Sequence, residues 1–216
     1  MRYITLFNIV LIILLPLLLF LLVFYFTAFD DSFYQEKFLQ YEVNKNVPDA
    51  IQLHYKVIDF VLGKGIGLPK QFNEREIKHL WDVRNAISKS KILLRALLIS
   101  FILLLILSAY LLKSKDRFIK FLSGILFFGG LLTIIIAAFL FLFIKSNFSP
   151  TFETFHMVLF KSGTYTFDPA REMIVNLYPE GLFMDLGIRI LILVITAAVV
   201  IILVGAVLIL KNKKNK

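Results

Sequence analysis

The sequence predicts an all-α integral membrane protein with four transmembrane helices and two structured, helix-containing extracytoplasmic loops. Four apolar runs are each long enough for a helix to cross a hydrocarbon core of about 30 Å, which takes about 20 residues. Short, dense clusters of basic residues follow two of these runs, and the longer polar stretches contain helix-start and turn signals of their own. We therefore expect a single membrane domain over residues 1–216.

The four expected spans lie at about 4–26, 92–112, 118–144 and 186–210. Arg95 and Arg189 fall in the first turns of the second and fourth spans, where a long side chain can reach the membrane interface. The first apolar run is longer than the roughly 7–15 residues of a signal-peptide core, and no clear small-x-small cleavage site precedes Asp30. We therefore expect this run to remain in the protein as a span.

Basic residues predict the orientation, because short cytoplasmic segments carry an excess of Lys and Arg. The turn between the second and third spans and the tail after the fourth are both short and basic: Lys113, Lys115, Arg117 and Lys120, then Lys211, Lys213, Lys214 and Lys216. Both termini are therefore expected in the cytoplasm, and the loops at about 28–91 and 146–185 on the outer side. The first loop is itself rich in Lys, but long loops follow the charge rule less strictly.

Composition excludes several classes of function. The net charge of +9 and the pI near 9.7 would suggest nucleic acid in a soluble protein, but here the charge is largely in the inner clusters, which can lie against anionic lipid headgroups. We therefore expect no nucleic-acid partner. The chain has no cysteine, so it has no disulfide and no thiolate nucleophile. It also lacks a Gly-rich phosphate loop, an HExxH motif and a GxSxG motif.

The first outer loop is expected to contain two helices. Pro48-Asp49 precedes an apolar stripe with helical spacing, formed by Ile51, Tyr55, Ile58 and Leu62. A cluster of helix-breaking residues then ends this helix: Gly63, Gly65, Gly67 and Pro69. Asn73 and Glu76 have the spacing of a capping box for a helix that starts near Glu74. Since no Gly or Pro interrupts it before the second span, that helix is predicted to continue into the membrane as one rod.

The second outer loop is apolar and also predicts helices. Ser149-Pro150 marks a helix start before a strongly aromatic segment: Phe152, Phe155, His156, Leu159 and Phe160. Ser162-Gly163 predicts a turn, and Asp168-Pro169 predicts a second helix with Pro at its first position. Pro179 ends that helix shortly before the fourth span. So many Phe and Leu residues outside a span indicate a loop that dips into the outer membrane interface.

Polar residues of the two loops are candidates for a functional site. Glu76, His79 and Asp82 are three residues apart and therefore lie on one face of the predicted helix, with Arg84 close by. A neutral histidine with a pKa near 6.5 can move protons at neutral pH, and a carboxylate one turn away can fix its tautomer. His156 in the second loop is the other candidate.

Each candidate also has an ordinary structural explanation. Loop histidines are usually solvated or hydrogen-bonded, and His54 is expected on the polar side of its amphipathic helix. Glu76 and Asp82 fit a capping residue and a solvated helix face, and Arg84 fits an anchor for a lipid phosphate. Two histidines and Asp82 are possible metal ligands, but their spacing is not that of a tight site, so we expect no metal.

Four segments of the chain resemble a known family. Residues 72–84 match the family pattern F-x-x-x-E-x-x-H-hydrophobic-x-D-V. The other segments lie in the second loop: Phe155-His156-x-x-x-Phe160, Phe167-Asp168-Pro169 and Tyr178-Pro179-Glu180-Gly181-Leu182-Phe183. Their order and spacing and the four-span layout resemble the bacterial lipoprotein intramolecular transacylases, the Lit family, over nearly the whole chain.

This resemblance implies an acyltransferase of the bacterial cytoplasmic membrane with its active site on the outer face. The implied substrate is a diacylglyceryl lipoprotein whose N-terminal cysteine carries a free α-amine. The implied reaction moves the sn-2 acyl chain from the glycerol oxygen onto that amine and yields the lyso-form lipoprotein. Beyond this substrate and membrane lipids, we expect no cofactor, no outside acyl donor and no required protein partner.

The residues that would perform this reaction follow from the same resemblance and from their chemistry. We expect His79 to act as a base oriented by Asp82 or Glu76, and His156 to act as an acid or an oxyanion donor. The two histidine roles are exchangeable. Arg84 or a backbone N–H is a further oxyanion donor, and a covalent acyl-histidine intermediate is chemically possible.

Two other classes of function remain open from the sequence. A non-catalytic partner subunit of a larger membrane complex predicts that both histidines are dispensable. A metal-dependent membrane hydrolase predicts sensitivity to chelators and water as the nucleophile. A transporter is the weakest alternative, because no span has a charge near its middle or an obvious broken-helix pair.

Overall fold

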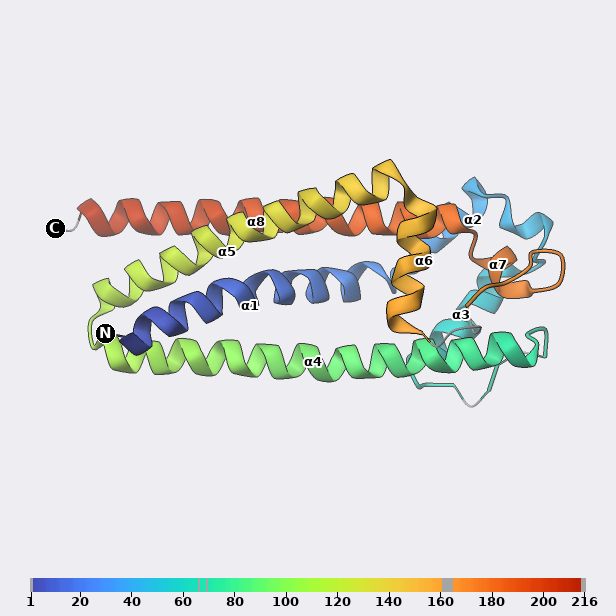
Figure 1. The fold of residues 1–216 in the computed structure, drawn as a ribbon, viewed down its shortest axis with the longest axis horizontal. Helices are drawn as coiled ribbons and strands as arrows, with labels where there is room; N and C mark the ends of the chain where they lie inside the picture. Colours follow the sequence, from blue (N-terminus) through green and yellow to red (C-terminus); the bar gives the residue numbers. More distant parts are fainter. Residues whose placement is uncertain (1, 66, 69, 161–164, 215–216) are drawn as a thin grey trace. The chain divides into compact units, whose positions relative to one another are not determined.

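The computed structural model describes residues 2–65, 67–68, 70–160 and 165–214, and this part of the chain contains helices and no strand. Four helices are long and apolar enough to span a membrane (Figure 1): α1 (Arg2–Thr27), α4 (Glu74–Leu112), α5 (Lys115–Ser146) and α8 (Glu180–Lys214). They contain the four expected spans, so the predicted fold class is confirmed. The chain divides into two compact units, which are described separately below.

The membrane unit comprises residues 1–25, 92–142 and 189–216. Glycines on α5 allow other helices to approach it closely. A Cβ on Gly129 would lie 2.7 Å from Leu15 Cδ2 on α1, and a Cβ on Gly130 would lie 2.6 Å from Ile202 Cγ1 on α8. Small residues at such contacts are how transmembrane helices pack when lipid supplies no hydrophobic driving force.

The second unit comprises residues 26–91 and 143–188 and is here called the outer unit, because it nearly coincides with the two predicted outer loops. It contains the first part of α4, the beginning of α8, and five short elements: α2 (Asp31–Gln40), the 3-10 helix η1 (Val43–Lys45), α3 (Ala50–Val61), α6 (Phe148–Leu159) and α7 (Met173–Leu177). All candidate site residues belong to this unit.

The N-terminus of α4 forms the predicted capping box. Asn73 Oδ1 accepts hydrogen bonds from the backbone N–H groups of Arg75 (2.9 Å) and Glu76 (3.0 Å). In return, Glu76 Oε2 accepts one from Asn73 N–H at 2.7 Å. The helix then continues for 39 residues, which confirms the predicted rod that begins in the outer loop.

The end of α2 packs against the start of α8 because Gly181 has no side chain. A Cβ at this position would lie 2.7 Å from the Tyr41 hydroxyl oxygen. This approach allows the Tyr41 hydroxyl to donate to Asp185 Oδ2 (3.2 Å), which also pairs with Lys37 Nζ (2.9 Å). The beginning of α8 is thereby attached to the first outer loop.

The predicted apolar stripe of α3 was wrong in its rotation about the helix axis. Ile51, Tyr55, Ile58 and Leu62 are only partly buried, whereas the fully buried face also contains a histidine: Ala50, Leu53, His54, Val57, Phe60 and Val61. The sequence pattern does not predict this rotation because histidine is a polar residue, although the His54 ring lies in the core with 0% exposure. The helix itself and its end at Gly63 (φ +80°) are as predicted.

The second outer loop differs from its prediction at Asp168-Pro169. A single turn forms there in place of a helix: the carbonyl of Asp168 accepts hydrogen bonds from the N–H groups of Arg171 and Glu172, both at 2.9 Å, but the backbone of Glu172 is extended and ends the turn. The helix α7 begins only at Met173 and ends before Pro179. The helix α6 begins at Phe148, close to the predicted start. The predicted turn at Ser162-Gly163 and the breaker Pro69 lie outside the described residues.

Candidate active site

Two histidines from different outer loops lie next to each other. His79 belongs to the first turns of α4 and is 6% exposed, whereas His156 belongs to α6 and is half-buried. Their ring centroids are 6.1 Å apart, and the ring planes are inclined by 24°. The fold thus brings together the two histidines that the sequence singles out.

Aromatic rings surround this pair. Phe160 and Phe167 contact His79 edge to face, with centroid distances of 4.9 and 5.4 Å. Phe152 and Tyr165 contact His156 at 4.3 and 5.5 Å. Because these neighbours carry few polar atoms, the site disfavours charge on either imidazole and excludes water from much of its surface.

A hydrogen bond within α6 determines the tautomer of neutral His156. Its Nδ1 lies 2.7 Å from the carbonyl oxygen of Phe152. A carbonyl can only accept, so Nδ1 carries the hydrogen and Nε2 carries the free lone pair. Burial lowers the pKa of His156, and the bond to Phe152 opposes this effect. Neutral His156 therefore offers Nε2 as a proton acceptor.

His79 is also held neutral. It lies on the polar first part of α4, ahead of the membrane-spanning segment that begins near Ile92. Burial lowers its pKa from 6.5 to about 4; nearby His156 adds to the decrease, and the negative charge of Asp82 opposes it. Among the described residues, neither Nδ1 of His79 nor Oδ2 of Asp82 has a hydrogen-bond partner. Asp82 thus acts on His79 through its charge.

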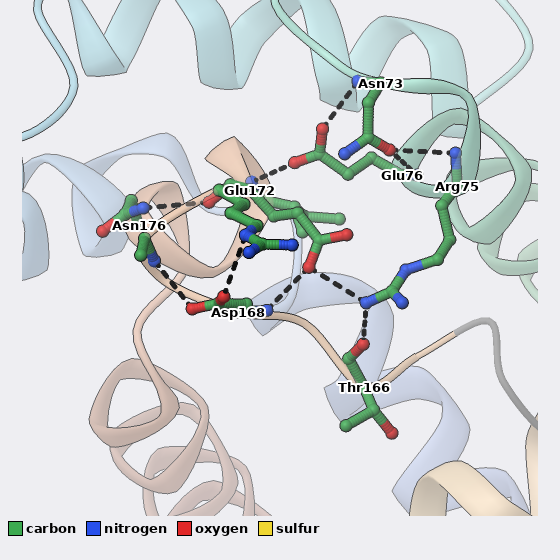
Figure 2. A network of polar contacts seen from close by, with 10 residues as sticks. Asn73, Arg75, Glu76, Thr166, Asp168, Glu172 and Asn176 are labelled. Atoms are coloured by element: carbon green, nitrogen blue, oxygen red, sulfur yellow. Dashed lines mark hydrogen bonds and ion pairs between the residues drawn. The ribbon is translucent and has the colours of Figure 1, made fainter.

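Glu76 has partners other than the histidines. It is 1% exposed, and beside its bond to Asn73 it accepts a hydrogen bond through Oε1 from Ile174 N–H at 2.7 Å. Both carboxylate oxygens are therefore occupied by backbone N–H groups from the two outer loops (Figure 2). Of the two carboxylates expected to orient His79, Asp82 is the one whose charge acts on its pKa.

A polar network missed by the sequence analysis adjoins the pair. Arg75 Nη2 donates to Glu172 Oε2 (3.0 Å) and to the carbonyl of Thr166 (Figure 2). Its guanidinium lies 5.2 Å from the Phe167 ring centroid. Glu172 also accepts from Asp168 N–H at 2.6 Å. No local pattern links Arg75 to Glu172, because the two lie in separate loops.

Arg84 contributes to packing at the end of α3. Its guanidinium lies over the rings of Trp81 (4.8 Å) and Phe60 (5.2 Å), next to the turn at Gly63. Such cation–π contacts stabilise by about 0.5–1 kcal/mol each at exposed sites. A role for Arg84 as an oxyanion donor or lipid anchor stays a prediction.

His54, predicted to face solvent, is buried in a second aromatic cluster. Its Nδ1 shares a hydrogen bond of 2.9 Å with the Tyr178 hydroxyl, and its ring lies 4.1 Å from that of Tyr34 and 5.7 Å from that of Phe38. Burial lowers its pKa to about 4. Among the described residues, no group of three His, Cys, Asp or Glu side chains is arranged to hold a metal ion.

The family model of the lipoprotein intramolecular transacylase Lit matches residues 9–183. This chain belongs to the Lit family. Its fold is that of the Bacillus cereus Lit structure, with a TM-score of 0.80 at 22% identity over 99% of both chains. Two Bacillus cereus Lit variants, with one histidine changed to arginine or alanine, match with TM-scores of 0.79 and 0.78 at 23% identity. These matches cover 100% and 99% of this chain and 96% of each variant chain. No curated protein matches the chain.

Lit membership makes the chain a membrane-integral protein of a transacylase family that acts on lipoproteins. The matched region contains both histidines of the pair, Asp82, and the Arg75–Glu172 network. The part of α8 after residue 183 lies outside it.

Proposed function

We propose that this Lit-family protein moves the sn-2 acyl chain of a diacylglyceryl-cysteine lipoprotein onto the α-amine of the same cysteine. The product is the lyso-form lipoprotein, with one acyl chain on nitrogen and one on glycerol. The observation that carries this proposal is the pair of neutral histidines, 6.1 Å apart in an aromatic shell. Such a site can transfer protons at pH 7 while it limits the access of water, which would otherwise compete with the amine.

The reaction balances without another reactant. The amine nitrogen forms a bond to the ester carbonyl carbon, and the bond from that carbon to the sn-2 oxygen breaks. One proton leaves the amine, and one is added to the departing glycerol oxygen. Because amine and ester belong to one molecule, the enzyme mainly has to hold them in an attack geometry. Orientation of this kind is worth up to about 7–11 kcal/mol in ideal intramolecular reactions.

The tautomer of His156 favours it as the residue that carries the proton. Its Nε2 accepts the amine proton and then donates that proton to the glycerol oxygen. His79 stays neutral meanwhile, because a charge on His156 opposes a second charge nearby. A neutral ring retains one N–H, which donates to the oxyanion of the tetrahedral intermediate. This proposal exchanges the two roles expected from the sequence, where His79 is the base.

The topology completes the proposal. The basic turn after α4 and the basic tail of α8 favour cytoplasmic termini, and this orientation supports a site on the outer face of the bacterial membrane. Diacylglyceryl lipoproteins are anchored at this face by their acyl chains. The exposed apolar side chains of α6, among them Phe155, Met157 and Val158, suit contact with lipid.

Mass spectrometry of lipoprotein N-terminal lipopeptides tests the proposal. The host should lack other N-acylating enzymes and should express the wild type, His79→Ala, His156→Ala or the matched buried histidine variant His54→Phe. We expect lyso-form lipopeptides from the wild type and from His54→Phe at equal amounts of folded protein. His79→Ala and His156→Ala should leave the diacylglyceryl form unchanged.

Other outcomes separate the alternative functions. Loss of an acyl chain without N-acylation would indicate a hydrolase, and loss of that activity with chelator would indicate a metal-dependent one. An unchanged diacylglyceryl form with the wild type would favour a non-catalytic partner subunit.

A further inference from the structure

Residues 165–172, here called the 165–172 segment, form part of the wall around the histidine pair. Tyr165 contacts the ring of His156, and Phe167 contacts the ring of His79 with centroids 5.4 Å apart. Among the described residues, the backbone hydrogen bonds of this segment are confined to the turn at Asp168–Glu172, which Asn176 also holds through the carbonyls of Pro169 and Glu172. The part that carries Phe167 precedes this turn and depends on other interactions.

Arg75 supplies those interactions from the first turn of α4. One guanidinium nitrogen, Nη2, donates to the carbonyl of Thr166 near the start of the segment and to the carboxylate of Glu172 at its end. The same guanidinium lies 5.2 Å from the Phe167 ring centroid. Phe167 therefore contacts both Arg75 and His79, and Arg75 holds the backbone beside it.

Glu172 is the buried partner of this arginine. It is 7% exposed, and its Oε2 accepts both from Arg75 and from Asp168 N–H. A carboxylate is buried at a considerable cost unless charge-assisted hydrogen bonds compensate for it, and here they do. Removal of Arg75 would leave that charge without its cationic partner and favour displacement of the 165–172 segment.

We propose that Arg75 and Glu172 are positioning residues for the transacylation: they hold Phe167 against His79 and so keep water away from the reacting histidine pair. This inference rests on the proposed function for its catalytic consequence, but the contact of Phe167 with His79 is independent of the reaction. Neither residue touches a histidine, so both act through Phe167.

The test compares four single variants and one double variant of the full-length protein in detergent or vesicles. Arg75→Ala removes charge and contacts, Arg75→Lys keeps only the charge, and Phe167→Leu removes the aromatic edge without changing charge. The matched control is Arg171→Ala, which removes an exposed arginine of the same segment whose partner Asp168 is 3.7 Å away. A synthetic diacylglyceryl lipopeptide serves as substrate for kcat and KM, and NMR titration of the His79 ring gives its pKa.

We expect Arg75→Ala and Phe167→Leu to lower kcat roughly tenfold, a part of the roughly 10²–10⁴-fold that acid–base catalysis supplies, with little change in KM. In both variants, Arg75→Ala and Phe167→Leu, the pKa of His79 should rise toward 6.5 as water reaches the ring. Asp82 and His156, the charged or titratable groups that act on His79, are unchanged in these variants. Arg75→Lys should resemble Arg75→Ala, because an ammonium lacks the planar face that lies over the Phe167 ring. Arg171→Ala should match the wild type.

The double variant Arg75→Ala/Phe167→Leu should be no slower than the slower single variant, because both changes act on one pathway. Additive losses, full rescue by Arg75→Lys, or an unchanged His79 pKa in Phe167→Leu would each overturn the proposal. The titration does not depend on turnover. A wild type that is inactive on the lipopeptide but whose His79 pKa responds as expected would refute the proposed function and leave the positioning intact.

Discussion

His54 and the pair formed by His79 and His156 belong to one outer unit, but their neighbours differ in kind. Burial is the main cause of a lowered pKa at all three histidines. His54 has a tyrosine hydroxyl as partner and lies among the rings of Tyr34 and Phe38, within a packed helical core. In the pair, each histidine has the other one as a neighbour, with ring centroids 6.1 Å apart. Burial and a low pKa alone therefore do not identify a catalytic histidine, whereas a second proton acceptor beside it does indicate one.

The largest expected effect is a contrast between two variants: one should lose activity and keep its stability, and the other should lose stability and keep its activity. His156→Phe should slow transacylation by about 10²–10⁴-fold while changing the unfolding temperature little, because His156 is half-buried and its hydrogen bond to the Phe152 carbonyl lies within α6. His54→Phe should keep its turnover per folded molecule and lose stability, because the buried Tyr178 hydroxyl loses its partner, at about 1–3 kcal/mol. Turnover and thermal unfolding of both variants, measured on the same samples, check this contrast. If His54→Phe lost turnover at full stability, the distinction between the two sites would fail.

A second expectation concerns Glu76. The sequence predicts it beside His79, but in the structure its carboxylate accepts hydrogen bonds from backbone N–H groups. Glu76→Ala leaves the buried N–H group of Ile174 without its acceptor and removes the capping bond to the exposed Asn73. The expected cost is about 1–3 kcal/mol of unfolding free energy, mainly from the buried Ile174 donor. Thermal unfolding measures this loss. Glu74→Ala, in the same helical turn, is the control and should change stability much less, because Glu74 is exposed. A variant that unfolds like the wild type but is inactive would instead support a direct role of Glu76 at His79.

The sequence predicts much of this molecule where the signal is local. The four spans follow from the length of the apolar runs, and the capping box follows from the spacing of Asn73 and Glu76. The features that it misses depend on distant partners. The predicted helix at Asp168-Pro169 is a single turn that ends at Glu172, whose backbone is extended and whose carboxylate is bonded to Arg75 in the other loop. The burial of His54 likewise depends on Tyr178, which lies 124 residues further along the chain. The proximity of His79 to His156 also depends on two segments that are distant in the sequence. Only the resemblance to the Lit family indicates that the two residues act together.

The smallest expected effect is a change in pH dependence that sharpens the comparison of the histidines. The pKa of His54 is about 4 in the folded protein and 6.5 without burial, so the unfolded chain binds more protons between these values. Stability attributable to neutral His54 is therefore complete above pH 6.5 and is lost as the pH falls toward 4. In His54→Phe there is no imidazole to protonate, so the variant lacks this loss of stability at low pH. It also lacks the hydrogen bond to Tyr178. The variant should be less stable than the wild type at pH 7.5, and the difference should shrink or reverse near pH 4.5. Unfolding temperatures at both pH values measure this difference in stability.

Asp31 Oδ1 lies 3.9 Å from His54 Nε2 and stabilises any protonated His54, which reduces the pH dependence of stability. Asp31→Asn should therefore enlarge that pH dependence. A difference between His54→Phe and the wild type that is constant with pH would mean that His54 titrates alike in the folded and unfolded states. The burial that places it in the core would then have no electrostatic consequence.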